Sequence, residues 1–138
     1  MVLVDSSVWI EAARRKGSAE VKCALEGLLE EYQAAVCGLV WLEVLGGALA
    51  VNRARLQSYF SVLPRLRTPE DTWDYAATHA GKLRDEGLTI PWSDVLVASV
   101  AMAHNVRVYS CDRHFDLMGR SLGFGLYEPG YGGRYVNS

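Results

Sequence analysis

The chain of 138 residues is half apolar and 22% charged, which is the composition of an ordinary globular domain with a hydrophobic core. We expect one domain over residues 1–138 without a linker, and a loosely ordered Gly-rich tail over 130–138. The longest stretch with a single charge, residues 38–51, is too short to cross a bilayer and carries Glu43 at its middle. The N-terminus has no basic segment or cleavage site of a signal peptide, so we expect a cytoplasmic protein.

The net charge of −2 counts against a nucleic-acid partner, because such proteins usually carry a basic face. This net charge is misleading about the rest of the surface if five of the 16 acidic residues belong to one metal site. The 14 Lys and Arg then outnumber the remaining acids outside that site. Those five acids are Asp5, Glu43, Asp94, Asp112 and Asp116.

Short apolar strands alternate with helices in the first half of the chain. Residues 2–4 predict a strand, and the two serines after Asp5 offer N-cap chemistry for a helix to about residue 15. Apolar residues at helical spacing predict an amphipathic helix over 18–31. Residues 34–37 predict a second buried strand, and a helix over 39–50 follows it.

The second half continues this alternation. A short helix is predicted over 53–60, with an edge strand at 62–63 because Pro64 ends sheet pairing. Thr68 and Pro69 are a strong start signal for a helix to about residue 86, which Gly87 stops. The remaining predicted elements are a helix over 93–105, a strand over 106–109, a short helix after 112 and a strand over 124–127.

Strands that alternate with helices and are apolar on both sides predict an α/β fold in three layers. Its central sheet is mainly parallel and is covered by helices on both faces.

Four acids stand alone in apolar surroundings. Asp5 follows the first strand and Asp112 follows the strand near residue 109, so both lie at the carboxyl ends of strands, where functional sites of parallel sheets collect. Glu43 is the only charged residue between Gly38 and Val51. Asp94 is likewise the only charged residue over 89–103.

Each acid also has a purely structural explanation. Asp94 taken alone is better explained as an N-cap or first-turn acid, and Asp5 and Asp112 can open strand-to-helix turns. Glu43 is the hardest to explain in this way, because a mid-helix carboxylate on an apolar face needs a partner and no Lys or Arg stands nearby. The combination of four favours a shared site.

Converging carboxylates predict a bound cation. Two of them about 4 Å apart repel by roughly 4 kcal/mol at an effective dielectric constant near 20, so four do not all stay ionised unaided. Oxygen ligands favour Mg²⁺, with Mn²⁺ as a substitute, over zinc. Such ions complete their coordination with substrate phosphate, so the expected chemistry is phosphodiester hydrolysis.

These residues, in this order, resemble the PIN-domain family. The segments that carry the resemblance are Val-Leu-Val-Asp5-Ser-Ser-Val-Trp, Leu-Val-Trp-Leu-Glu43, Pro-Trp-Ser-Asp94 and Ser-Cys-Asp112-Arg-His-Phe. They span residues 2–116, and within the family the chain is most similar to VapC toxins. The resemblance implies an Mg²⁺-dependent ribonuclease that is the toxin of a type II toxin–antitoxin system, a homodimer, and a VapB-like antitoxin whose C-terminal segment blocks the acidic pocket and which also binds DNA.

The resemblance also implies roles for particular residues. Asp5, Asp94 and Asp112 coordinate metal, and Glu43 holds water or another ligand in place at the metal. Three further residues are expected to support the site or to have a plain structural role. They are Ser110, Ser6 and Asp116. For Ser6 an N-cap role is an equal explanation. Asp116 lies one helical turn beyond Asp112, and its place in the family is variable.

Surface residues offer two more hypotheses. A group of basic residues is expected either to contact RNA phosphates or to be simply solvated. The group consists of Arg14, Arg15, Lys16, Arg53 and Arg55. Trp9, Trp41 and Trp92 neighbour the acids in apolar runs, which predicts core positions for most of them and leaves base stacking open for one.

Other functions fit the residues less well. A haloacid-dehalogenase-like phosphatase needs a second acid where this chain has Ser7, and a dinucleotide-binding domain needs a Gly-rich turn after the first strand. The three cysteines have no disulfide or zinc spacing, so we expect reduced, mostly buried thiols and no thiol catalysis by Cys111 and His114. Two alternatives stay open: a solitary PIN-domain RNA-processing nuclease and a catalytically silent PIN-fold RNA-binding module.

Overall fold

A computed structural model describes residues 1–129, and the tail predicted to be loosely ordered, 130–138, lies outside these residues. Its centre is a parallel sheet in the strand order β3-β2-β1-β4. The strands are β1 (Val2–Val4), β2 (Ala34–Cys37), β3 (Arg65–Leu66) and β4 (Arg107–Tyr109). Every residue of β1 and β2 is buried, as expected for strands that are covered on both faces.

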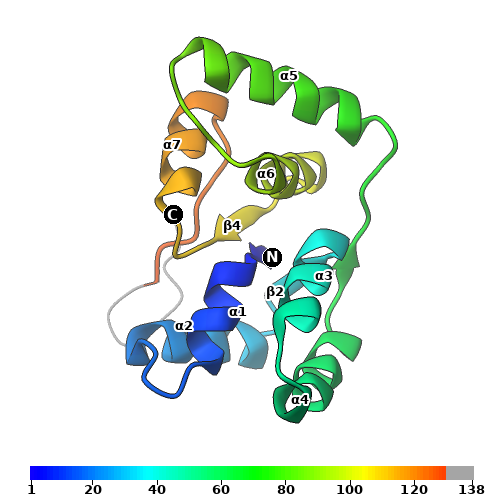
Figure 1. The fold of residues 1–138 in the computed structure, drawn as a ribbon, viewed down its shortest axis with the longest axis vertical. Coiled ribbons are helices and arrows are strands. Elements are labelled where there is room, and N and C mark those ends of the chain that lie inside the picture. Colours follow the sequence, from blue (N-terminus) through cyan, green and yellow to red (C-terminus); the bar gives the residue numbers. More distant parts are fainter. Residues whose placement is uncertain (130–138) are drawn as a thin grey trace.

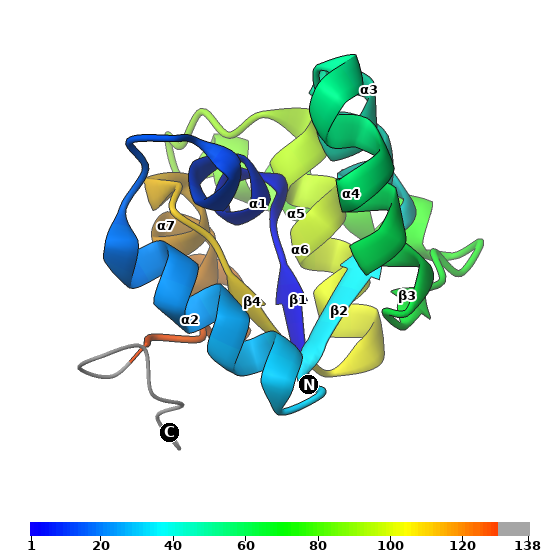
Figure 2. The ribbon, with the colours of Figure 1, turned by 90° about the horizontal axis from the view of Figure 1, so that it is seen from below.

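Seven helices surround the sheet in the described part of the chain. They are α1 (Ser6–Ala13), α2 (Ala19–Glu30), α3 (Gly38–Gly47), α4 (Ala50–Ser61), α5 (Thr72–Asp85), α6 (Trp92–His104) and α7 (Arg113–Leu122). Helices α1 and α2 lie on one side of the sheet and α5, α6 and α7 pack together on the other (Figures 1 and 2). The predicted three-layer α/β fold with a parallel sheet is therefore confirmed. None of the helices in residues 1–129 is long and apolar enough to cross a membrane.

Three strands open directly into helices at the same edge of the sheet. Asp5 lies between β1 and α1, Gly38 begins α3 immediately after β2, and Asp112 precedes α7 shortly after β4. Because β1 pairs in parallel with both β2 and β4, the residues that follow these strands gather at one edge. The helix that the two serines were expected to cap is instead capped by Asp5, whose side chain accepts a hydrogen bond from the backbone N of Ser7.

Two predicted elements are displaced around prolines. The edge strand begins after Pro64 rather than before it, because Val62 and Leu63 still bond to the last turn of α4 while the Pro64 carbonyl accepts from the Val36 N–H at 3.0 Å. Helix α5 begins at Thr72 rather than at residue 68, since Pro69 belongs to a turn whose carbonyl accepts from the Thr72 N–H.

Two other predictions are wrong in detail. The strand predicted over residues 124–127 is reduced to one isolated parallel bridge, which pairs Leu126 with Val108. Cys37 is buried as expected, but Cys23 and Cys111 are exposed, although all three thiols are free as predicted.

The end of α2 stores backbone strain. The Tyr32 N–H donates to the Leu29 carbonyl and the Gln33 N–H to the Leu28 carbonyl, a Schellman arrangement that requires a left-handed residue at position 32. Tyr32 has a φ of 55° and is 87% exposed, so its side chain gains little packing in return.

We expect Tyr32→Gly to raise the free energy of unfolding by about 0.5–1 kcal/mol, because glycine adopts left-handed φ without the steric cost of a Cβ. Urea denaturation of the two proteins measures this difference. Tyr32→Ala is the matched control, since it removes the ring and keeps the strain. A glycine variant no more stable than the alanine variant would show that the strain is not significant.

Candidate active site

The carboxylate of Asp5 is held by hydroxyl groups from two segments of the chain. Asp5 is only 3% exposed. Its Oδ2 accepts from the Ser7 hydroxyl at 2.7 Å, from the Ser110 hydroxyl at 2.9 Å and from the Ser7 backbone N–H at 3.4 Å. These donors of the described chain all end on one oxygen, which leaves Oδ1 as the oxygen available to a further ligand.

The same two hydroxyls tie Asp5 to the loop after β4. The Cys111 N–H donates to the Ser7 hydroxyl at 3.0 Å, and the Asp112 N–H donates to the Ser110 hydroxyl at 2.9 Å. Ser110 thus contacts the carboxylate it was predicted to support. Ser7 was missed, although a hydroxyl two residues after an N-cap aspartate is well placed to bond back to it.

Asp94 and Asp112 meet at the ring of His114. The His114 Nδ1 lies 3.0 Å from Asp94 Oδ2 and 3.0 Å from Asp112 Oδ1. The backbone N–H of His114 also donates to Asp112 Oδ1 at 3.0 Å, because Asp112 is the N-cap of α7. Asp94, in the first turn of α6, comes from the other side of the group. His114 was not among the site residues expected from the sequence.

Electrostatic repulsion links Glu43 and Asp94 to Asp5 and Asp112, although among the described residues only Asp94 and Asp112 come close enough to share an ion with His114. Burial raises the pKa of Glu43 most, and the negative charges of Asp5 and Asp94 raise it further, against a hydrogen bond from Ser6. Burial also raises the pKa of Asp94, with added repulsion from Asp5 and Asp112 and an opposing hydrogen bond from His114. Ser6, at the start of α1, therefore lies near Glu43.

Asp116 lies apart from this group. It is exposed and lines a separate hollow with Arg107 and Arg120.

The three donor atoms that come within 4.8 Å of one another in the described chain belong to Asp94, Asp112 and His114.

This donor set fits a divalent cation. Carboxylate oxygens and an imidazole nitrogen are metal ligands, and the mutual repulsion of the half-buried acids is the kind that a cation relieves. The nitrogen is a difference from the oxygen-only site that the sequence predicted.

Basic and apolar grooves lead away from Glu43. A hollow of about 230 Å³ is lined by Glu43, Trp9 and Arg14. Trp9 and Arg14 also line a neighbouring groove of about 310 Å³, together with Arg15, Lys22 and Arg55. Three of the basic residues singled out in the sequence therefore line one groove, although Arg14 is also paired with Glu11 at 3.0 Å. Arg53 instead donates to the Ala48 carbonyl.

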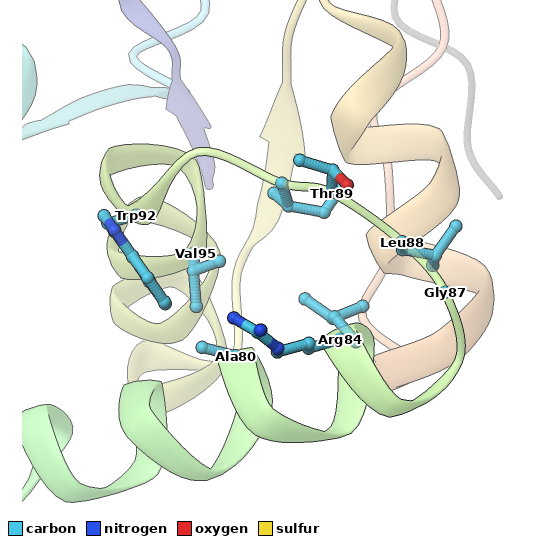
Figure 3. A pocket seen from close by; sticks show the side chains of 9 residues that line it. Ala80, Arg84, Gly87, Leu88, Thr89, Trp92 and Val95 are labelled. Atoms are coloured by element: carbon cyan, nitrogen blue, oxygen red, sulfur yellow. The ribbon is translucent and has the colours of Figure 1, made fainter.

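The tryptophans differ in exposure. Trp9 is 3% exposed and packs edge-on against Phe60, and Trp41 also packs against Phe60, whereas Trp92 is 74% exposed. Figure 3 shows Trp92 and Arg84 beside a hollow of about 380 Å³ between α5 and α6. Because Trp92 and Asp94 are two residues apart on a helix, their side chains leave α6 about 200° apart, and none of the four acids lines this hollow.

Comparison with known proteins gives consistent matches. Residues 2–120 match the PIN domain. The chain is 34% identical over 127 residues to VapC ribonuclease Mb1587 of Mycobacterium bovis and to Ribonuclease VapC11 of Mycobacterium tuberculosis, with 87% of this chain and 92% of each relative covered. Its fold is similar to a chain of VapBC2 from Rickettsia felis, solved bound to a DNA fragment from their promoter. The TM-score is 0.74 at 21% identity, and 91% of this chain and 97% of that chain are covered.

The raised pKa of Asp94 has a consequence for stability without metal. An acid whose pKa is raised in the folded protein stabilises the fold at pH values below its unfolded-state pKa. This stabilisation is lost as the pH rises through the folded-state pKa. The ordinary value for Asp is 3.8, so the loss falls on the neutral side of it.

We therefore expect Asp94→Asn to be more stable than the wild type in EDTA, by a margin that grows as the pH rises above the ordinary Asp value of 3.8. Asparagine removes the charge and can still accept the hydrogen bond from His114. The free energy of unfolding, measured by denaturant titration at each pH, tests this, with the exposed Asp85→Asn as control. A margin that does not change with pH would contradict the raised pKa of Asp94.

Proposed function

Since the chain belongs to the PIN-domain family and, within it, to the VapC ribonucleases, we propose that it is a divalent-metal-dependent ribonuclease that acts as the toxin of a toxin–antitoxin pair. The observation that carries this proposal is the group of mutually repelling carboxylates of Asp5, Glu43, Asp94 and Asp112 at one edge of the sheet. We further propose that it is a single-domain cytoplasmic protein.

Mg²⁺ is the proposed cofactor, with Mn²⁺ as a substitute, and Asp5, Asp94 and Asp112 would hold it. When bound, the ion would supply charge stabilisation at the phosphate and a lowered pKa for attacking water. The Ser7 and Ser110 hydroxyls keep Asp5 Oδ2 occupied and so orient the carboxylate. Glu43, steadied by Ser6, would accept a hydrogen bond from the attacking water and orient it toward the phosphate.

RNA is the proposed substrate, as in the names of the two mycobacterial relatives. The groove lined by Arg14, Arg15 and Arg55 supports this assignment, because it offers positive charge for backbone phosphates next to the hollow that reaches Glu43. Lys16, in the turn after α1, would add to this charge, whereas Arg53 is bonded to the Ala48 carbonyl and lies outside the groove. Trp92 is the exposed tryptophan of the three, but it leaves α6 about 200° from Asp94, so it is better placed for contact with another chain than for stacking on a base at the acids.

A VapB-like antitoxin is the proposed partner, and a homodimer is the proposed assembly. The similar fold from Rickettsia felis occurs in VapBC2 bound to a promoter DNA fragment, which supports an antitoxin partner that also binds DNA. The exposed aromatic side chains Trp73, Tyr75 and Trp92 supply apolar surface for contact with another chain.

Labelled total RNA incubated with the purified protein tests the activity. We expect cleavage in Mg²⁺ or Mn²⁺ and none in EDTA. Asp5→Asn and Asp94→Asn should cut at least about a hundredfold more slowly, since each loses a charged metal ligand. Asp85→Asn, an exposed change of the same chemistry, should cut like the wild type. Folded site variants that cut at the wild-type rate would leave the RNA-binding module as the explanation.

A second measurement tests the partner. The product of a short reading frame next to the gene, added in equal amount, should abolish cleavage by the wild type because it covers the acidic pocket. Cleavage that continues in the presence of every adjacent product would favour a solitary RNA-processing nuclease.

A further inference from the structure

We propose that His114 is itself a ligand of the ion at the acidic site, through Nδ1, and that the site for this reason binds Mn²⁺ in preference to Mg²⁺. This inference rests on the proposed function, because it concerns the same ion. It goes further in naming a nitrogen ligand, and it reverses the order of metal preference, placing Mn²⁺ ahead of Mg²⁺.

The position of the ring carries the argument. The Nδ1 of His114 is 3.0 Å from an oxygen of Asp94 and 3.0 Å from an oxygen of Asp112. Two adjacent ligands of an octahedral ion with bonds of about 2.1 Å lie about 3.0 Å apart. The nitrogen therefore stands at the separation from both oxygens that neighbouring ligands of one ion have.

The backbone holds the ring in this place. His114 is in the first turn of α7, and its N–H donates to the carboxylate of Asp112, the residue that caps the helix. Its side chain is 36% exposed, against 16% for Asp94, so the ring lies at the open side of the group rather than in the core.

A hydrogen bond explains the same distances without a metal. In that case Nδ1 carries the ring proton and donates it to Asp94. In the metal-bound state Nδ1 offers its lone pair and the proton lies on Nε2, the neutral form in which histidine binds metals. The two explanations differ in whether a nitrogen is bonded to the ion, which is directly measurable.

A nitrogen ligand changes the choice of metal. Imidazole suits transition ions, whereas Mg²⁺ is held almost entirely by oxygen, so a mixed donor set shifts the preference toward Mn²⁺. The other two histidines are engaged elsewhere: His79 contacts the Ser99 hydroxyl, and His104, at the far end of α6 from Asp94, contacts the Arg67 carbonyl.

The test is pulsed electron paramagnetic resonance of the full chain loaded with Mn²⁺ in the absence of RNA. We expect a ¹⁴N coupling from one imidazole, replaced by a ¹⁵N coupling when the histidines are labelled with ¹⁵N. The coupling should be absent in His114→Asn, whose carboxamide can still donate a hydrogen bond to Asp94, and present in the control His104→Gln. The ratio of Mn²⁺ to Mg²⁺ affinity, from competition titrations, should fall by about tenfold or more in His114→Asn only.

Every other outcome overturns the role of His114. Mn²⁺ bound to the wild type without a nitrogen coupling, or with a coupling that survives in His114→Asn, overturns the role of His114 and leaves the carboxylate ribonuclease intact. A wild type that binds neither ion overturns the proposed function together with this inference. The labelled wild-type protein decides the question even if His114→Asn fails to fold.

Discussion

The mutual repulsion of carboxylates at one edge of the sheet is the constraint on which the rest of this structure depends. Burial and negative neighbours raise the pKa of both Glu43 and Asp94, so the folded chain works against their ionisation. A core of buried strands and helices holds these groups together nonetheless. A bound cation would relieve the repulsion between these like charges, and this links the stability of the protein to its proposed chemistry.

The parallel sheet supplies the geometry for this arrangement. Strands β1 and β4 are neighbours, and each is followed by an aspartate that caps the next helix. A capping aspartate has one oxygen committed to backbone or hydroxyl donors, so its orientation is set before any ligand arrives. Ser7 and Ser110 extend this principle, because each hydroxyl donates to Asp5 and accepts from the backbone of the loop after β4. The site is built on element ends, which are better defined than long loops.

The resemblance to the PIN-domain family and to VapC toxins is confirmed by the match over residues 2–120 and by the mycobacterial relatives. The structure adds a feature that the resemblance did not include: an imidazole between two of the acids. The structure also places the basic surface residues and the exposed aromatic residues on different surfaces. Basic residues gather along α1, α2 and α4 on one side of the acids, while the exposed aromatic residues lie on α5 and at the start of α6. Polyanion binding and protein contact thus have different surfaces available.

The sequence by itself determined the strands β1, β2 and β4, most of the helices and the four isolated acids, because apolar periodicity and a lone charge in an apolar run are local features. It misplaced β3 and the start of α5, where turns at Pro64 and Pro69 compete with helix and strand signals. Only the tertiary structure decided that Ser7 and Ser110 share one carboxylate and that His114 reaches Asp94. It also decided that Trp92 rather than Trp9 is exposed. These contacts join segments far apart in the chain, so they depend on strand register and helix packing, which no local pattern encodes.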